Sequence, residues 1–207
     1  MPTRPSQATR SRIVRSAVLV FAEHGYDGAS IRAIVARADV NQAAINYHFG
    51  NKEGLYRAVL KLALQTLTAG DGAGTAEAPS PEAALRAFVD RQLRPLAATD
   101  ELSRYLRIFN WETVRPTPTF RRFMAEEASP YLAGVTALVR RFLPTRASEQ
   151  QAAIAALWLL GQCSIFVRNA EQLSRPPLNF KIDRSFVDGL AGTITNWAVA
   201  GLSQKPE

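Results

Sequence analysis

The sequence predicts an all-α fold, in which a small N-terminal group of helices precedes a larger helical body. Apolar residues recur at spacings of three and four along most of the chain, which is the period of an amphipathic helix. Alternating apolar and polar residues, the pattern of a half-buried strand, are not visible in the sequence. With 207 residues, of which 47% are hydrophobic, the chain can bury a core and lies between one and two domains in size.

The first predicted helix begins near Thr9 or Ser11, because either hydroxyl can cap a helix N-terminus. It ends at Gly25, since glycine is a good C-terminal stop. Its apolar stripe consists of Ile13, Ala17, Val20 and Phe21. This helix is expected to close a small N-terminal core.

Residues 30–52 predict two short helices joined by a tight turn. Ser30 can cap the first of them, and Asn41 can cap the second. Between them, Asp39 occupies the turn, where a left-handed backbone is needed that Asp adopts more readily than most residues. The second helix points Ala44, Ile45 and Phe49 inward and leaves Gln42, Ala43, Asn46 and Tyr47 outward.

The outward face of this second helix has the side chains that suit a DNA major groove. Gln and Asn can each bond two atoms of adenine, and Ala can contact a thymine methyl group. Lys52 stands in the first turn of the next helix, where the helix dipole disfavours a cation by about 0.3–1 kcal/mol unless an anion such as phosphate is bound. Taken alone, an ordinary surface helix with one lysine explains these residues as well.

The run Val40–Leu55, with Tyr-His-Phe at residues 47–49 followed by Lys52 and Glu53, resembles the recognition helix and following helix of the TetR family of transcriptional regulators. The resemblance extends upstream through residues 13–32. Two positions depart from it: Asp39 stands where the family usually has Gly, and Asn46 stands where an aromatic residue is common. The departure at Asn46 affects which DNA bases the second helix prefers, and not the fold.

The resemblance implies a helix-turn-helix DNA-binding domain over residues 1–55 and a helical ligand-binding and dimerisation domain over residues 56–207. It implies a homodimer through the two C-terminal helices, bound to a near-palindromic double-stranded operator and released by an unknown small-molecule effector, as in a repressor. Ser30 and the turn at Asn51 are expected to anchor phosphates. The candidate DNA-binding residues are Ser30, Arg32, Asn41, Gln42, Ala43, Ala44, Asn46, Tyr47, His48 and Lys52.

The body is predicted to consist of further helices. Asn51 begins a helix to about residue 67, residues 70–80 read as a loop, and Ser80-Pro81-Glu82 starts a helix that runs to about Ala98. Later helices are expected over residues 101–114, from about 117, from the break at Ser129-Pro130 to Pro144, from Ser148 to beyond Phe166, and from Asp183. In the last one, the predicted buried face contains Phe186, Leu190, Ile194 and Trp197.

Glu112 is the most informative polar residue of the body, because it lies at the edge of an apolar stripe. A buried carboxylate needs a partner, and Arg168 and a bound ligand are the two candidates. An effector pocket could be lined by Tyr105, Phe109, Glu112, Phe123, Trp158, Gln162 and Phe166. The alternative is that these aromatic residues are plain core.

Charge and composition narrow the function classes. Residues 1–60 carry eight Lys and Arg against four Asp and Glu, so the basic part is the small N-terminal part. One cysteine, Cys163, allows no intrachain disulfide, which favours a cytoplasmic location. The apolar run 152–167 is expected to be a buried helix, not a membrane anchor.

An enzyme and a non-specific DNA-binding protein are the two alternatives to a regulator. An enzyme would need a convergent nucleophile and base, and with two His in the chain neither a catalytic constellation, a metal site nor a cofactor is expected. A non-specific, architectural DNA-binding protein fits the basic N-terminal part equally well. It differs from a regulator in its lack of sequence preference.

Overall fold

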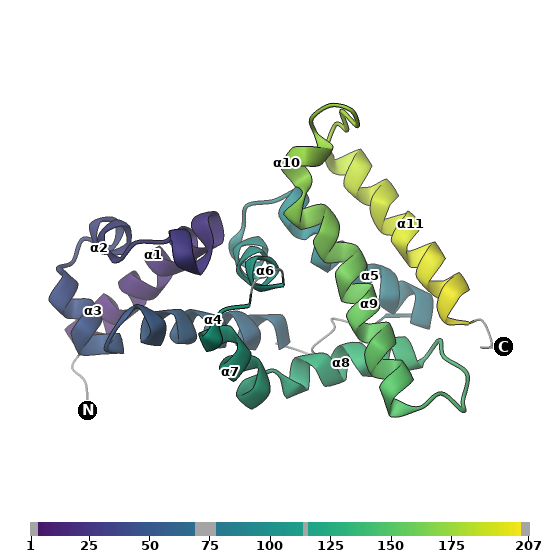
Figure 1. Cartoon of the computed structure of the whole chain (residues 1–207), viewed down its shortest axis with the longest axis horizontal. Coiled ribbons are helices and arrows are strands. Elements are labelled where there is room, and N and C mark those ends of the chain that lie inside the picture. Colours follow the sequence, from purple (N-terminus) through teal and green to yellow (C-terminus); the bar gives the residue numbers. More distant parts are fainter. Residues whose placement is uncertain (1–3, 69–77, 114–115, 204–207) are drawn as a thin grey trace. The chain divides into compact units, whose positions relative to one another are not determined.

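The structure, a computed structural model, describes residues 4–68, 78–113 and 116–203, and these residues form helices joined by turns (Figure 1). Within these ranges there is no β-strand, so the predicted all-α fold is confirmed. In chain order the elements are α1 (Arg4–Gly28), α2 (Ile31–Ala38), α3 (Gln42–Phe49), α4 (Lys52–Thr68), α5 (Pro81–Leu93), the 3-10 helix η1 (Arg94–Leu96), α6 (Glu101–Glu112), α7 (Pro118–Glu127), α8 (Ser129–Arg140), α9 (Glu149–Arg168), α10 (Ala170–Leu173) and α11 (Arg184–Leu202).

The chain divides into two compact units. The head unit consists of Met1–Gln65 and Arg104–Glu127, and the body unit consists of Thr66–Ser103 and Ala128–Glu207. The division falls inside α4 and inside α6, so each of these two helices contributes residues to both units. The predicted boundary after residue 55 separates a DNA-binding domain from a ligand-binding and dimerisation domain by function, and it stays a prediction.

The first helix starts earlier than predicted from the sequence. A cap at Thr9 or Ser11 was wrong, because α1 already begins at Arg4. At Gly25 the backbone leaves the helical region with a φ of 65° and a ψ of −175°, so the predicted stop is present as a break within α1.

The core of the head unit is built from the apolar faces of α1, α2, α3 and α4. Its fully buried side chains include Ile13, Ala17, Phe21, Ile34, Ile45, Leu55, Tyr56 and Val59. Three aromatic rings lie together in it: Phe21 and Tyr56 are 4.7 Å apart between ring centroids, and Tyr26 and Tyr56 are 4.8 Å apart. This core fixes α3 against α1 and α2.

The turn between α2 and α3 has the geometry that the sequence predicts. Ser30 Oγ accepts a hydrogen bond from Ala33 N at 3.1 Å, and Asn41 Oδ1 accepts one from Ala44 N at 3.0 Å. Asp39 is left-handed, with a φ of 51° and a ψ of 56°. Both caps and the turn residue are therefore confirmed.

Replacing Asp39 with glycine is expected to raise the free energy of unfolding by about 0.5 kcal/mol, because glycine adopts a left-handed backbone without the steric cost that a side chain brings. The larger freedom of glycine in the unfolded chain offsets part of the gain. The urea midpoint of the purified variant measures it. Asp39→Ala is the control and should lower stability; equal stability of the two variants would contradict the explanation.

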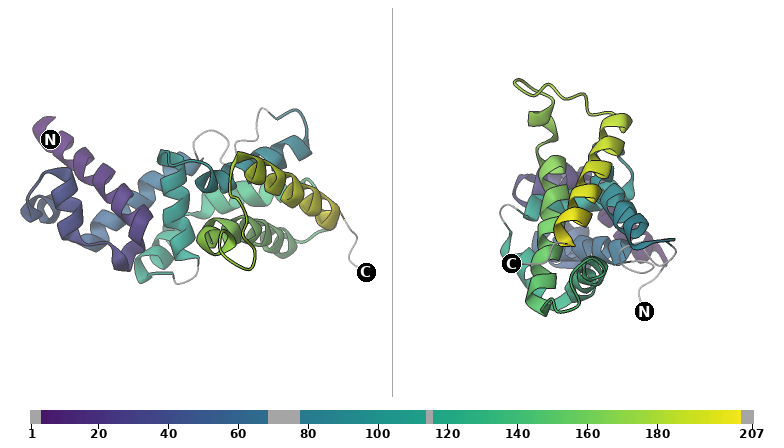
Figure 2. Two further views of the ribbon diagram at one scale, coloured as in Figure 1. Left: turned by 90° about the horizontal axis from the view of Figure 1, so that it is seen from above. Right: turned by 90° about the vertical axis from the view of Figure 1, so that its right-hand side faces the viewer.

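The body unit is a group of packed helices in which α5 contacts α8, α9 and α11, and α9 also contacts α8 and α11 (Figure 2). Three predicted caps are confirmed: Ser80 accepts from Ala83 N, Ser148 forms a capping box with Gln151, and Asp183 accepts from Phe186 N. The helix from Pro81 ends at Leu93 and not near Ala98. Pro95 explains the difference, because its nitrogen has no hydrogen to donate within an α-helix, and the chain continues as the 3-10 helix η1. The predicted loop at 70–80 lies mostly outside the described residues.

The last helix buries a different face from the predicted one. Its buried residues are Val187, Ala191, Ile194, Thr195 and Ala198, so Ile194 was placed correctly and Leu190 was not. Trp197 is 70% exposed, and its assignment to the buried face was wrong. The small residues turn inward because α11 packs closely on α5.

One face of α9 is apolar and uncovered in the single chain. Ile154, Leu157, Trp158 and Ile165 recur at helical spacing and are 58%, 58%, 40% and 47% exposed. In the described residues, α9 is the one helix long and apolar enough to cross a membrane, a test that the core helix of a soluble protein also passes. The apolar run 152–167 was expected to be a buried helix, and for this face of α9 that expectation does not hold within one chain.

Candidate DNA-binding surface and candidate ligand region

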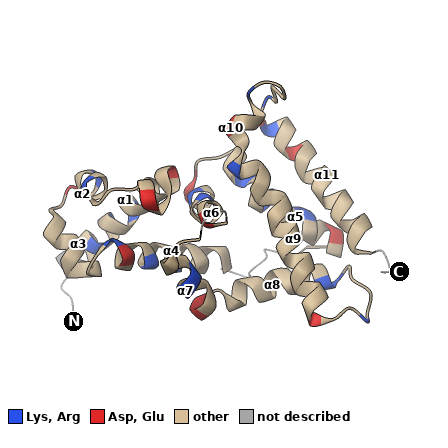
Figure 3. Cartoon of the chain, in the orientation of Figure 1, with Lys and Arg blue, Asp and Glu red and all other residues tan. Residues whose placement is uncertain are grey.

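The exposed face of α3 carries amide, small and aromatic side chains. Gln42, Ala43 and Asn46 are exposed, as predicted, and Tyr47 is 80% exposed. The His48 ring lies edge-on against the Tyr47 ring, with centroids 4.9 Å apart, and is half-buried. The sequence of α3 contains no Lys, Arg, Asp or Glu, and the charged side chains lie on neighbouring helices (Figure 3).

Two helix N-termini flank α3 in sequence. The Ser30 side chain caps α2, and the Asn51 side chain caps α4 by accepting from Gly54 N at 2.8 Å. Each side chain satisfies one backbone N–H, and the positive ends of the two helix dipoles remain near the surface. Arg32, in the first turn of α2, is exposed. These are features that bind phosphate.

Lys52 is held in place by an aromatic ring. Its Nζ lies 4.5 Å from the centroid of the Tyr26 ring. Partial burial lowers the pKa of Lys52, and the nearby Asp27 carboxylate opposes that shift. The contact fixes the cation at the start of α4, directly after the exposed helix α3.

A second cation–aromatic contact was not predicted. Exposed Arg10, on α1, places its guanidinium 5.1 Å from the centroid of the Phe49 ring at the end of α3. The sequence signal for it was weak, because Arg10 and Phe49 are far apart along the chain. Arg10 adds positive charge beside α3.

Glu112 is buried, with 2% of its surface exposed, and its partners are now identified. Its carboxylate accepts hydrogen bonds from Tyr56 Oη at 2.7 Å, from Thr117 N at 2.6 Å and from Thr117 Oγ1 at 3.0 Å. Tyr56 and Thr117 were not among the expected partners, which were Arg168 and a ligand. The carboxylate therefore joins α4, the end of α6 and the start of α7 within the head unit.

The buried environment of Glu112 also changes the pKa of Tyr56. Burial raises the pKa of the Tyr56 hydroxyl, and the hydrogen bond to the Glu112 carboxylate raises it further. The hydroxyl therefore keeps its proton at neutral pH and donates its hydrogen bond to the Glu112 carboxylate.

The seven residues of the predicted effector pocket fall into both units. Tyr105, Phe109, Glu112 and Phe123 belong to the head unit, where Tyr105 and Phe123 are fully buried. Phe109 packs edge-on against Phe120, a residue outside the predicted set, with ring centroids 5.5 Å apart. Trp158, Gln162 and Phe166 belong to the body unit, all on α9. The pocket stays a prediction.

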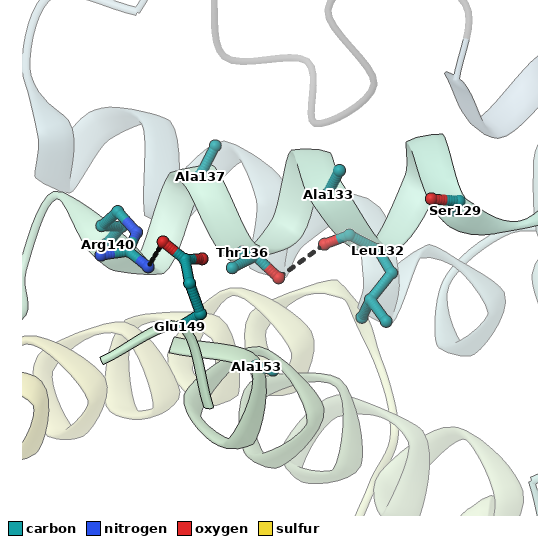
Figure 4. A pocket seen from close by; sticks show the side chains of 8 residues that line it. All are labelled: Ser129, Leu132, Ala133, Thr136, Ala137, Arg140, Glu149 and Ala153. Carbon is teal, nitrogen blue, oxygen red and sulfur yellow. Dashed lines mark hydrogen bonds and ion pairs between the residues drawn. The ribbon is translucent and has the colours of Figure 1, made fainter. Parts of the chain in front are cut away.

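An open groove of about 480 Å³ lies between α8 and α9 in the body unit (Figure 4). It is lined by Ser129, Leu132, Ala133, Thr136, Ala137, Arg140, Glu149 and Ala153. At one end, Arg140 Nη2 lies 2.7 Å from Glu149 Oε1. Apart from Leu132, its lining residues are small, polar or charged, and none of the seven predicted pocket residues is among them.

Two parts of the chain match known protein families. Residues 13–59 match bacterial regulatory proteins of the tetR family, and residues 81–202 match the C-terminal domain of the HTH-type transcriptional dual regulator CecR. The HTH-type transcriptional repressor SCO4008 of Streptomyces coelicolor is 35% identical over 112 residues, which cover 54% of this chain and 53% of that protein. The chain thus matches about half the length of that relative.

Solved structures share the fold. FadR from Bacillus subtilis, crystallised in complex with stearoyl-CoA, superposes with a TM-score of 0.70 and 17% identity, covering 92% of this chain and 98% of that one. AibR, in complex with isovaleryl coenzyme A and operator DNA, superposes with a TM-score of 0.66 and 18% identity, covering 89% of this chain and 97% of that one. At this identity the likeness establishes the architecture alone.

Proposed function

Because the chain belongs to the TetR family of DNA-binding transcriptional regulators, we propose that it is a repressor that a small-molecule effector releases from a near-palindromic operator. The observation that carries this proposal is the uncharged, exposed face of α3 between two capped helix N-termini. Such a face can read bases, and the flanking helix ends can bind phosphates.

Within this proposal the residues of α3 have separate roles. Gln42 and Asn46 bond to base edges, Ala43 contacts a thymine methyl group, and Tyr47 and His48 add hydrogen bonds. Ser30, Arg32, Asn41, Ala44 and Lys52 complete the proposed DNA-binding set, with Lys52 on a phosphate. Ala44 is half-buried, and its backbone N–H donates to the Asn41 cap.

Two copies of the chain are proposed to pair through α9 and α11. The uncovered stripe of Ile154, Leu157, Trp158 and Ile165 on α9, together with Trp197 on α11, is larger than the scattered apolar residues of an ordinary surface. A four-helix interface from both copies would cover it, and two heads would then meet two half-sites.

The effector is proposed to bind in the helical body region, and acyl-CoA esters are the first probes to use. Two proteins of the same fold are known in complex with stearoyl-CoA and isovaleryl-CoA. An apolar acyl chain would suit aromatic lining residues such as Trp158 and Phe166, which belong to the body unit. If an acyl-CoA ester of defined chain length releases the protein from its operator, that result supports acyl-CoA esters as the effector class.

Sequence preference separates a repressor from an architectural DNA-binding protein. We expect the protein to bind a site selected from random duplexes, or from its own upstream region, at least about a thousandfold more tightly than random DNA at physiological salt. Fluorescence anisotropy with labelled duplexes measures both affinities. Equal binding to both kinds of DNA would contradict the repressor.

Gln42→Ala combined with Asn46→Ala should reduce the preference for the selected site by about tenfold or more, because each bidentate contact to adenine contributes about 1–3 kcal/mol of discrimination. Lys52→Ala should weaken selected and random DNA alike and lower the salt dependence by about one phosphate contact. Anisotropy titrations at several salt concentrations separate the two. If both variants change selectivity equally, the assigned roles are wrong.

A further inference from the structure

We propose that residues 174–183, which connect α10 to α11, form a dimerisation arm whose tip enters the groove between α8 and α9 of a second copy. The inference rests on the proposed dimer and adds to it a contact outside the α9 and α11 face. Both the arm and the groove belong to the body unit. The occupant of the groove is thus a named segment of another copy of this chain.

The arm is an exposed loop with an apolar tip. Figure 1 shows it extending beyond the ends of α9 and α11. Residues 174–181 are all exposed, and among them Leu178 and Phe180, which form the tip, are 49% and 39% exposed. Covering these two side chains with a partner would remove apolar surface from water, which favours association.

Backbone hydrogen bonds and one ring contact hold the tip against the body unit. Phe180 N donates a hydrogen bond to Leu173 O at 2.8 Å. Leu178 N donates one to Arg175 O at 3.1 Å. The Phe180 ring packs on the Phe186 ring in the first turn of α11, with centroids 5.6 Å apart. Binding a partner therefore requires little further ordering of the arm backbone.

The arm cannot reach the groove of its own chain. The groove lies at the start of α9, where Glu149 and Ala153 line it, whereas the arm follows the end of that helix. The 20 residues of α9 span about 30 Å, at a rise of about 1.5 Å per residue. The contacts of Phe180 with Leu173 and Phe186 keep the tip at the far end. A tip that enters this groove therefore comes from another copy.

A twofold arrangement makes two such contacts at once. In an isologous dimer, a tip in the partner's groove is accompanied by the reverse contact. The two α9 helices then run in opposite directions, because the end of each lies beside the start of the other. The same arrangement covers the exposed stripe that lies along α9 between its groove end and its arm end, which consists of Ile154, Leu157, Trp158 and Ile165.

The groove has the size and the chemistry to accept the tip. It measures about 480 Å³, and Leu132 and three alanines line it (Figure 4). Glu149, at one end, leaves 90% of its side chain exposed beside its partner Arg140. Lys181, next to the tip, has a side chain that is 89% exposed. The ammonium of one copy and the carboxylate of the other are complementary in charge.

Crosslinking of the full-length protein tests the contact. One variant carries Leu178→Cys with Ala133→Cys at the groove, and the matched control carries Leu178→Cys with Ala87→Cys on α5. Ala133 and Ala87 are both exposed and belong to the body unit. A disulfide needs Cα atoms within about 7 Å, which the separation of arm and groove excludes within one chain. Cys163 does not interfere, because it is buried and burial raises the pKa of its thiol to about 12.

After mild oxidation, we expect the groove variant to run mostly as a covalent dimer on non-reducing gels and the control to run as a monomer. Leu178→Ser combined with Phe180→Ser should raise the dimer dissociation constant about tenfold or more, because four large apolar side chains per dimer lose their burial. Arg175→Ser, in the same arm, should leave that constant unchanged. Sedimentation equilibrium measures it for each variant.

The outcomes separate the arm from the proposed dimer. If the wild-type protein is a dimer but the control crosslinks as well as the groove variant, the arm contact is wrong and the dimer through α9 and α11 stands. An unchanged dissociation constant in the double serine variant would overturn the arm contact in the same way. If the wild-type protein sediments as a monomer at all concentrations, the proposed dimer is itself wrong.

Discussion

Replacing Glu112 with alanine is expected to lower the free energy of unfolding by about 3 kcal/mol or more. The change leaves the Tyr56 hydroxyl, the Thr117 N–H and the Thr117 hydroxyl without their acceptor in a buried site. Each unsatisfied buried donor costs about 1–3 kcal/mol. Urea unfolding followed by circular dichroism measures the loss, and it should also appear as a lower melting temperature.

Glu126→Ala is the matched control for this prediction. Glu126 is an acid of the same unit that pairs with Arg57 at 2.6 Å, but its side chain is 51% exposed. An exposed ion pair of this kind contributes about 0–1 kcal/mol. If Glu112→Ala cost no more than Glu126→Ala, the carboxylate would not be the structural centre that its three hydrogen bonds indicate.

Introducing arginine at Leu157 is expected to convert the proposed dimer into a monomer and to weaken operator binding by about a hundredfold. The charge would be buried without a partner in the apolar face of α9, which costs several kcal/mol for the two copies in the interface. Leu157 is 58% exposed in the single chain, so the fold of each copy should persist. Sedimentation equilibrium gives the mass, and anisotropy gives the operator affinity.

Ala87→Arg provides the control for the monomer prediction. Ala87 is exposed on α5, so the variant adds the same charge to the same unit outside α9 and α11. It should keep the dimer mass and the operator affinity. A Leu157→Arg protein that sediments as a dimer would place the interface elsewhere.

Local signals explain what could be predicted well. The caps at Ser30, Asn41, Ser148 and Asp183 and the left-handed turn at Asp39 depend on residues within three positions of each other. A hydrogen bond from a side chain to the next turn of backbone forms whatever the rest of the fold does. The exposed face of α3 followed from helical periodicity for the same reason.

Errors arose where a periodic pattern has two explanations. A stripe of apolar residues on α11 was assigned to the core, yet Trp197 is exposed and alanines face inward. Periodicity gives the apolar face of a helix, but not whether its own chain or another copy covers it. The short helix α10 and the early start of α1 carried too little pattern to be predicted.

The sequence by itself determined the all-α class, the helix-turn-helix geometry of residues 30–52 and the residues that face away from its core. Only the tertiary structure decided what satisfies Glu112, because Tyr56 lies 56 positions earlier in the chain. It likewise brought Trp111 to Ala22 and Arg10 to Phe49. The physical reason is that hydrogen bonds along a helix are set by neighbours in sequence, whereas contacts between helices depend on how their faces pack.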